Sequence, residues 1–105
     1  MAESIEEISV TYEEDGETLV EELDKVVLSR GSWTTILFKY REFDKKKEGM
    51  GPIKYTIRRY QKRNGVYRQQ SKFNISSVKQ AQQLVDALSG WVRDDAANGD
   101  AGDDD

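Results

Sequence analysis

The chain has 105 residues, of which 16 are Lys or Arg and 20 are Asp or Glu, giving a formal net charge of −4. This length predicts one compact domain with tails. The absence of Cys and His excludes disulfides, thiolate sites and the commonest general base and metal ligand, so we expect no enzyme activity, catalytic residue, metal or cofactor. No apolar run suggests a membrane span or signal peptide. We therefore expect a soluble protein of the cytoplasm or nucleoid, or of the nucleus in a eukaryote, without a membrane partner.

The charges are segregated along the chain. Residues 1–24 contain ten acids and no base, residues 25–92 contain fifteen bases and four acids, and residues 93–105 contain one base and six acids. The middle segment, with a net charge of +11, is predicted to be a nucleic-acid-binding domain. Residues 1–24 are predicted to be a mostly loose acidic arm. Residues 93–105 are predicted to be a disordered tail, since residues 94–105 contain only Asp, Ala, Asn and Gly, which cannot bury enough apolar surface to fold.

Four strands are predicted within the basic domain. A β-branched run indicates a first strand over 26–28. Aromatic and β-branched residues indicate a second strand over 33–43, which a polar loop with three consecutive lysines follows. Alternating apolar and polar residues indicate a third strand over 53–62. Asn64-Gly65 then indicates a hairpin that returns over 66–75.

The register of this hairpin is predicted from burial. A two-residue turn at Asn64-Gly65 would place Phe73 and Ile75 on the cationic face of the sheet. A three-residue turn that includes Arg63 pairs Tyr55 with Phe73 and leaves one face apolar. The longer turn is therefore predicted, and the opposite, cationic face is expected to lie uncovered.

A helix is predicted after the last strand. Ser76 or Ser77 can cap its N-terminus and Gly90 can end it. Its apolar stripe consists of Val78, Ala81, Leu84, Val85, Leu88 and Val92. Packing this stripe on the apolar sheet face predicts an α+β fold, with a four-stranded antiparallel sheet followed by one C-terminal helix. The stripe is wider than one small sheet can cover, which predicts a homodimer. The predicted interface residues are Leu84, Val85, Leu88 and Trp91.

Basic side chains interleaved with aromatic rings on an open sheet are typical of single-stranded nucleic-acid binding, because cations neutralise phosphates and unpaired bases stack on rings. The predicted phosphate contacts are Lys39, Arg41, Lys54, Arg58, Lys62, Arg68 and Lys72. The predicted stacking rings are Tyr60 and Trp33, with Phe43 on the same strand face as Trp33. Two alternatives stay open: an adaptor whose basic sheet docks acidic segments of a partner protein, and a sheet face that carries Lys and Arg only to prevent aggregation.

Two segments resemble the positive-cofactor-four type of single-stranded-DNA-binding transcriptional coactivators. They are Lys54-Tyr55-Thr56-Ile57-Arg58-Arg59-Tyr60 and Lys72-Phe73-Asn74-Ile75-Ser76, within a likeness that covers residues 25–90. The resemblance implies a homodimer with helices packed across a twofold axis and curved sheets that bind single-stranded DNA. It also implies groove positions at Arg58 and Tyr60 beside Lys54. Transcription or replication proteins are expected as further partners. Gln61, where many members have another aromatic residue, and the acidic leader depart from the family pattern.

Overall fold

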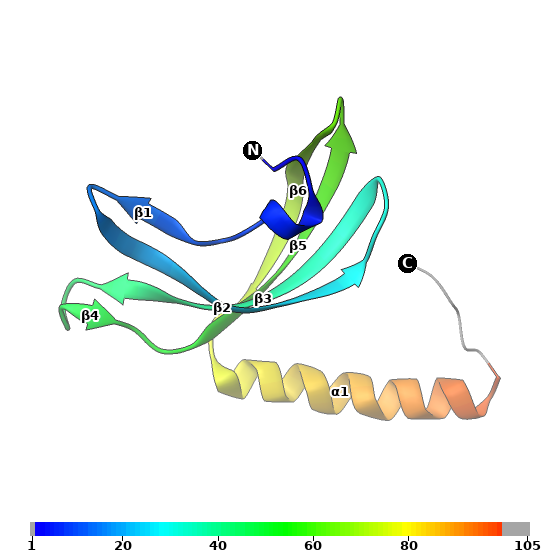
Figure 1. Cartoon of the computed structure of the whole chain (residues 1–105). Helices are drawn as coiled ribbons and strands as arrows, with labels where there is room; N and C mark the ends of the chain where they lie inside the picture. Colours follow the sequence, from blue (N-terminus) through cyan, green and yellow to red (C-terminus); the bar gives the residue numbers. More distant parts are fainter. Residues whose placement is uncertain (1, 100–105) are drawn as a thin grey trace.

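A computed structural model describes residues 2–99 of the chain (Figure 1). Within this range the elements are, in order, the 3-10 helix η1 (Ile5–Glu7), β1 (Tyr12–Glu14), β2 (Glu17–Ser29), β3 (Trp33–Asp44), β4 (Gly49–Met50), β5 (Lys54–Arg63), β6 (Val66–Ile75) and α1 (Val78–Ala97). The predicted α+β fold with a C-terminal helix is confirmed. The sheet of the described chain has six strands instead of the predicted four.

The sheet is antiparallel and strongly curled (Figure 1). Its strands lie in the order β1-β2-β3-β5-β6, and β4 pairs only with the end of β3. Residues 2–10 lie in the hollow of the sheet, while α1 runs along the outer side (Figure 1). The side in the hollow, which includes Ile36 and Phe38, is named the concave face. The outer side, which includes Leu37 and Ile57, is named the convex face.

The acidic arm is structured, so the prediction of a mostly loose segment over residues 1–24 is wrong for its described part. β1 pairs with the beginning of β2, and β2 pairs with β3 along most of its length. The predicted strand over 26–28 is only the last part of β2. Ile5, Ile8 and Val10 are 9%, 4% and 7% exposed. Their burial stabilises an arm whose many carboxylates can remain in water.

The β5–β6 hairpin has a two-residue turn, not the predicted three-residue turn. Asn64 and Gly65 have φ angles of 53° and 77°, as a type I′ turn requires. A β-bulge in the middle of the hairpin then shifts the register by one residue, and Phe73 pairs with Ile57 rather than with Tyr55. The bulge keeps Phe73 on the apolar, convex face without a longer turn.

The helix begins where its sequence predicts. Ser77 is the N-cap, and its hydroxyl accepts a hydrogen bond of 3.1 Å from the backbone N–H of Gln80. Gly90 does not end the helix, which continues to Ala97, because residues 91–97 include neither glycine nor proline. Residues 93–97 of the predicted disordered tail are therefore helical. Residues 100–105 of that tail lie outside the described residues.

Replacing Gly90 by Ala should stabilise the protein. A methyl group at this position meets no atom within 4 Å, and glycine within a helix is about 1 kcal/mol less favourable than alanine. We expect Gly90→Ala to raise the free energy of unfolding by up to about 1 kcal/mol in urea titrations at one protein concentration.

Gly65→Ala is the matched control for this substitution. Its new methyl group also meets no atom within 4 Å, but the φ angle of +77° strains any residue with a Cβ. The same change should therefore lower the free energy of unfolding. Effects of the same sign at Gly65 and Gly90 would contradict this assignment of their backbone roles.

Candidate nucleic-acid interface

The nine residues predicted to bind nucleic acid lie on both faces of the sheet. Directly opposed residues of neighbouring antiparallel strands share a face. Arg58 lies opposite Ile36 and Lys72 on the concave face, whereas Lys39 lies opposite Tyr55 on the convex face. The concave group is Lys54, Arg58, Tyr60, Lys62 and Lys72. The convex group is Trp33, Lys39, Arg41 and Arg68. The prediction of one continuous cationic face is therefore wrong. Lys39 lies on the other face because of the register between β3 and β5, and Arg68 does because the hairpin turn has two residues and not three.

Part of the concave face is covered, contrary to the sequence prediction, although Lys62 and Lys72 on this face are exposed. Ile5, Ile8 and Val10 form one apolar cluster with residues of β3, β5 and β6, including Phe38 and Tyr60. Tyr60 is 7% exposed, and burial raises the pKa of its phenol, an effect that the nearby Arg58 charge partly offsets. A ring that the protein itself covers cannot stack on a base, so Tyr60 is removed from the candidate stacking residues.

Residues 2–10 are held in the hollow by polar contacts at three points. The Nζ of Lys25 donates to the carbonyl oxygens of Ile5 and Ile8, each at 2.6 Å. A carboxylate oxygen of Glu22 accepts from Ser9 Oγ at 2.8 Å and from a backbone N–H at 3.3 Å. The backbone N–H of Tyr67 donates to the carbonyl of Ala2 at 2.8 Å. The only sequence signal that residues 2–10 pack on the concave face was the spacing of the apolar residues Ile5, Ile8 and Val10 within the acidic arm.

Removing the Lys25 ammonium should loosen residues 2–10. Lys25→Met keeps an unbranched side chain but leaves the Ile8 carbonyl without this donor, at a cost of about 1 to 3 kcal/mol. We expect the Tyr67 amide, which bonds to Ala2, to exchange its hydrogen about tenfold faster.

The Lys62 amide is the internal control for this exchange experiment. It donates to the Ser32 carbonyl at 2.7 Å and lies on the same hairpin, but it does not contact residues 2–10 through that bond. Its exchange rate should stay within about twofold of the wild-type rate. Equal acceleration of both amides would mean that the whole fold is weakened, which contradicts a local role for Lys25.

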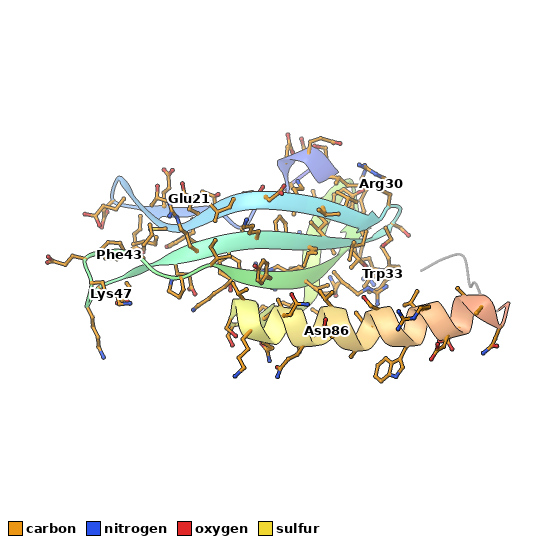
Figure 2. All side chains as sticks on the ribbon, turned by 90° about the horizontal axis from the view of Figure 1, so that it is seen from below. Glu21, Arg30, Trp33, Phe43, Lys47 and Asp86 are labelled. Carbon is orange, nitrogen blue, oxygen red and sulfur yellow. The ribbon has the colours of Figure 1, made fainter. Side chains whose placement is uncertain are left out.

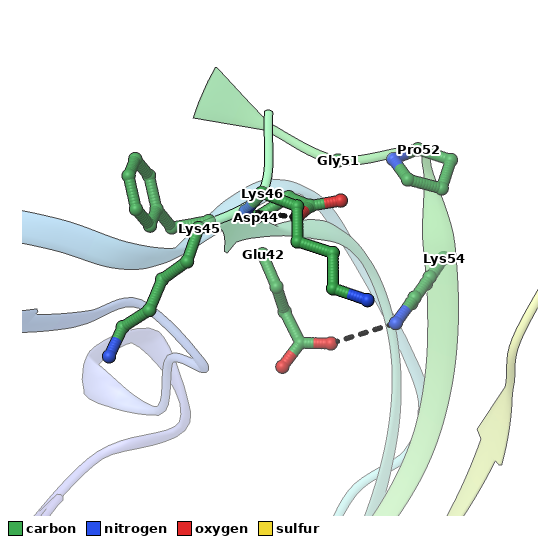
Figure 3. Close-up of a pocket in the computed structure, with 8 residues that line it drawn as sticks. Glu42, Asp44, Lys45, Lys46, Gly51, Pro52 and Lys54 are labelled. Carbon is green, nitrogen blue, oxygen red and sulfur yellow. Dashed lines mark hydrogen bonds and ion pairs between the residues drawn. The ribbon is translucent and has the colours of Figure 1, made fainter. Parts of the chain in front are cut away.

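Two predicted phosphate contacts are already paired with acids. Arg41 Nε lies 2.7 Å from Glu21 Oε1, and Lys54 Nζ lies 3.0 Å from Glu42 Oε1. The hydrogen bond to Glu42 raises the pKa of Lys54. Burial, followed by the Glu42 charge, raises the pKa of the adjacent Tyr40. The Lys54–Glu42 pair belongs to an open pocket of 340 Å³ (Figure 3). The lining of this pocket contains three lysines and two carboxylates, so acids offset most of its positive charge.

The largest group of free cations in the described chain lies on the β5–β6 hairpin, residues 54–75, named here the basic hairpin. It contains seven bases and no acid: Lys54, Arg58, Arg59, Lys62, Arg63, Arg68 and Lys72. Within residues 2–99, Lys54 alone of these seven has a carboxylate oxygen within 4.0 Å. Arg58 donates from Nη1 to Gln69 Oε1 at 3.1 Å, while its buried Nε has no hydrogen-bond partner in the described chain.

An arginine and a tryptophan stack at the convex side of the basic hairpin. The guanidinium carbon of Arg59 lies 4.8 Å from the centroid of the Trp33 ring, a cation–π geometry. Trp33, Gln61 and Arg68 lie opposite one another in a row across β3, β5 and β6. Trp33 is 38% exposed and lies at the opposite end of the sheet from Phe43 (Figure 2). Sequence reasoning missed Arg59, because only the strand register places it above Trp33.

An apolar groove of 560 Å³ lies between α1 and the convex face. Its lining includes Leu37, Ile57, Phe73, Leu84 and Leu88. No residue of α1 is fully buried, and Val85, Leu88 and Trp91 are 53%, 52% and 66% exposed. The predicted stripe faces the sheet but stays open to solvent, so its expected burial against the sheet is incomplete.

Other classes of site receive no support from the described residues. Residues 2–99 contain no cluster of three or more acidic side chains arranged to hold a metal ion. Within the same range, no helix combines the length and the apolar character needed to cross a bilayer. Comparison of the chain with protein-family models, with curated proteins and with solved structures found no match. Membership in the positive-cofactor-four type therefore stays a prediction.

Proposed function

We propose that this chain binds single-stranded nucleic acid through the basic hairpin. One observation supports this proposal above all: six of the seven cations on this hairpin have no acid within ion-pair distance in the described chain. Such a cluster attracts a polyanion, whose bound counterions are released when phosphates contact Lys and Arg. The family resemblance favours DNA as the polyanion and regulation of transcription as the role.

The convex side of the basic hairpin is the proposed contact surface. The exposed Trp33 ring lies there with Arg59, Arg63 and Arg68 nearby on β5 and β6, whereas residues 2–10 cover much of the concave side. An unpaired base can reach a tryptophan face, and such stacking contributes about 1 to 3 kcal/mol per base. Bases within a duplex are already stacked and paired, so the same surface should prefer single strands.

Neutralising two convex arginines should weaken binding and reduce its dependence on salt. Each phosphate contact adds about −0.7 to the slope of log affinity against log salt concentration for single strands, so Arg59→Gln with Arg68→Gln should reduce the slope by about 1.4. Fluorescence anisotropy with a labelled oligonucleotide measures both quantities. The control with the same charge change is Lys45→Gln with Lys46→Gln, in the loop at the other end of the sheet. Equal losses in the two double variants would mean that net charge alone, and not this surface, causes binding.

Removing the Trp33 ring should weaken binding to single strands selectively. We expect Trp33→Ala to lower the affinity for a single strand about tenfold and to leave duplex affinity within about twofold. Tyr12→Ala is the aromatic control, because Tyr12 is 52% exposed but lies on β1, away from the basic hairpin. Unchanged single-strand affinity in the Trp33 variant would contradict the proposed stacking contact.

A protein adaptor is the second candidate function, and the burial of Tyr60 favours it, because fewer rings than predicted can stack on bases. A basic hairpin that docks acidic protein segments needs charge but no stacking. Polyglutamate of matched charge distinguishes the two functions. If it displaces a labelled oligonucleotide as well as an unlabelled one does, the adaptor is favoured over the nucleic-acid-binding protein.

We also propose that the chain is a homodimer through the apolar side of α1. The open groove and the exposed Val85, Leu88 and Trp91 side chains support this arrangement, since obligate dimers bury such surfaces against a symmetric copy. Leu88→Asp should convert a species of about twice 12.0 kDa into a monomer at micromolar concentration, measured by sedimentation. Ser89→Asp places the same charge on α1 at a residue outside the groove lining and should stay dimeric. A monomeric wild-type chain would contradict the proposal.

A further inference from the structure

Two hairpins of the sheet have opposite charges of equal size. Residues 11–24, which contain β1 and the first part of β2, have seven acids and no base. Residues 54–75, the basic hairpin, have seven bases and no acid. Residues 11–24 are named here the acidic hairpin. The net charge of −4 conceals this separation of charge within the folded sheet.

Most carboxylates of the acidic hairpin are exposed and have no ion-pair partner in the described chain. Glu21 pairs with Arg41, and Glu22 accepts hydrogen bonds from Ser9 and Val10. The other five are exposed, and none has a Lys or Arg nitrogen within 4.0 Å in the described chain. They are Glu13, Glu14, Asp15, Glu17 and Asp24. Within the described chain, these five exposed and unpaired anions match five exposed and unpaired cations on the basic hairpin, which are Arg59, Lys62, Arg63, Arg68 and Lys72.

The two hairpins lie at opposite edges and opposite ends of the sheet. The strand order β1-β2-β3-β5-β6 makes β1 one edge and β6 the other. Val20 of the acidic hairpin lies opposite Glu42, at one end of β3, whereas Gln61 of the basic hairpin lies opposite Trp33, at the other end. Figure 1 shows the two hairpin tips diverging on either side of the hollow, with residues 2–10 between them. The free charges of the two tips therefore do not neutralise each other within one chain.

We propose that the acidic hairpin of one copy docks on the basic hairpin of a second copy. The second copy is the occupant that the charges specify, because it supplies an opposite charge of matching size on a similarly exposed edge hairpin. Since two different surfaces meet, the contact is heterologous, and the resulting pair keeps one free hairpin of each sign, to which further copies can add. This association is separate from the proposed dimer through α1, whose surface is apolar.

The contact should form at low salt and weaken as salt rises. Charges on exposed side chains are screened beyond about 10 Å at 0.1 M salt and beyond about 30 Å at 0.01 M. Apolar association through α1 does not weaken in this way. The mass measured at 0.5 M salt therefore provides the baseline against which electrostatic association is detected.

A mixing experiment tests the proposal in the full chain, freed of nucleic acid. One variant loses three anions by Glu13→Gln, Glu14→Gln and Glu17→Gln. A second loses three cations by Arg63→Gln, Arg68→Gln and Lys72→Gln. At 20 mM salt, the wild-type weight-average mass in sedimentation should be at least twice its value at 0.5 M salt. Each variant alone should keep the high-salt mass, and an equimolar mixture should regain a larger mass, because each variant supplies the hairpin that the other lacks.

Two controls make the outcome specific to these hairpins. Lys45→Gln, Lys46→Gln and Lys47→Gln remove three cations from the loop before β4, and Asp86→Asn, Asp94→Asn and Asp95→Asn remove three anions from α1. Both controls should associate at low salt as the wild type does. Equal wild-type masses at the two salt concentrations, loss of association in a control, or a mixture that stays at the high-salt mass would each overturn the proposal. No oligonucleotide is present, so the result is independent of the proposed nucleic-acid binding.

Discussion

The curl of the sheet creates a hollow, and apolar side chains must fill this hollow if its strands are to stay together. Ile36 and Phe38 of β3, both 0% exposed, supply one wall. Ile5, Ile8 and Val10 close the opening from a segment about thirty residues earlier in the chain. The Lys25 ammonium donates hydrogen bonds to the backbone carbonyls of Ile5 and Ile8. Without it, these two carbonyl oxygens would lie in the hollow without this donor. The accessible surfaces of the molecule follow from this arrangement, because the filled part of the concave face, which includes Tyr60, cannot also bind a ligand, whereas Lys62 and Lys72 on the same face stay exposed.

The elements with strong local signals were predictable from the sequence. β3, β5 and β6 follow from alternation and from β-branched and aromatic content, and the start of α1 follows from the cap at Ser77. The N-terminal cover was not predictable, since its stability comes from contacts with β3 and β5 rather than from its own acidic sequence. The predicted end of α1 at Gly90 was wrong. A single glycine destabilises the helix by less than the residues that follow it, up to Ala97, stabilise it.

The candidate site was predicted in composition but not in geometry. The cations of β5 and β6 were identified, yet the side of the sheet on which each lies depends on strand register and on a bulge. A shift of one residue moves a side chain to the other face, which is how Arg68 came to lie opposite Gln61, beside Trp33 and Arg59, instead of beside Arg58. The pairing of β3, β5 and β6 thus decides which cations lie beside Trp33. The residue pattern within one strand does not contain the register of that pairing.

The exposed tip of the basic hairpin has a consequence for proteolysis. Lys62 and Arg63 precede the turn at Asn64 and Gly65, and all four residues are exposed. Exposed tips of this kind are preferred sites of proteolytic nicking, and trypsin-like enzymes cleave after lysine and arginine. The charges that make the hairpin attractive to a polyanion thus also make its tip a point at which such a protease can open the folded chain, as the exposed loop at Lys45, Lys46 and Lys47 is as well. A partner seated on the tip would protect the chain from this cleavage, so the lifetime of the protein in a proteolytic environment would depend on how much of it is bound.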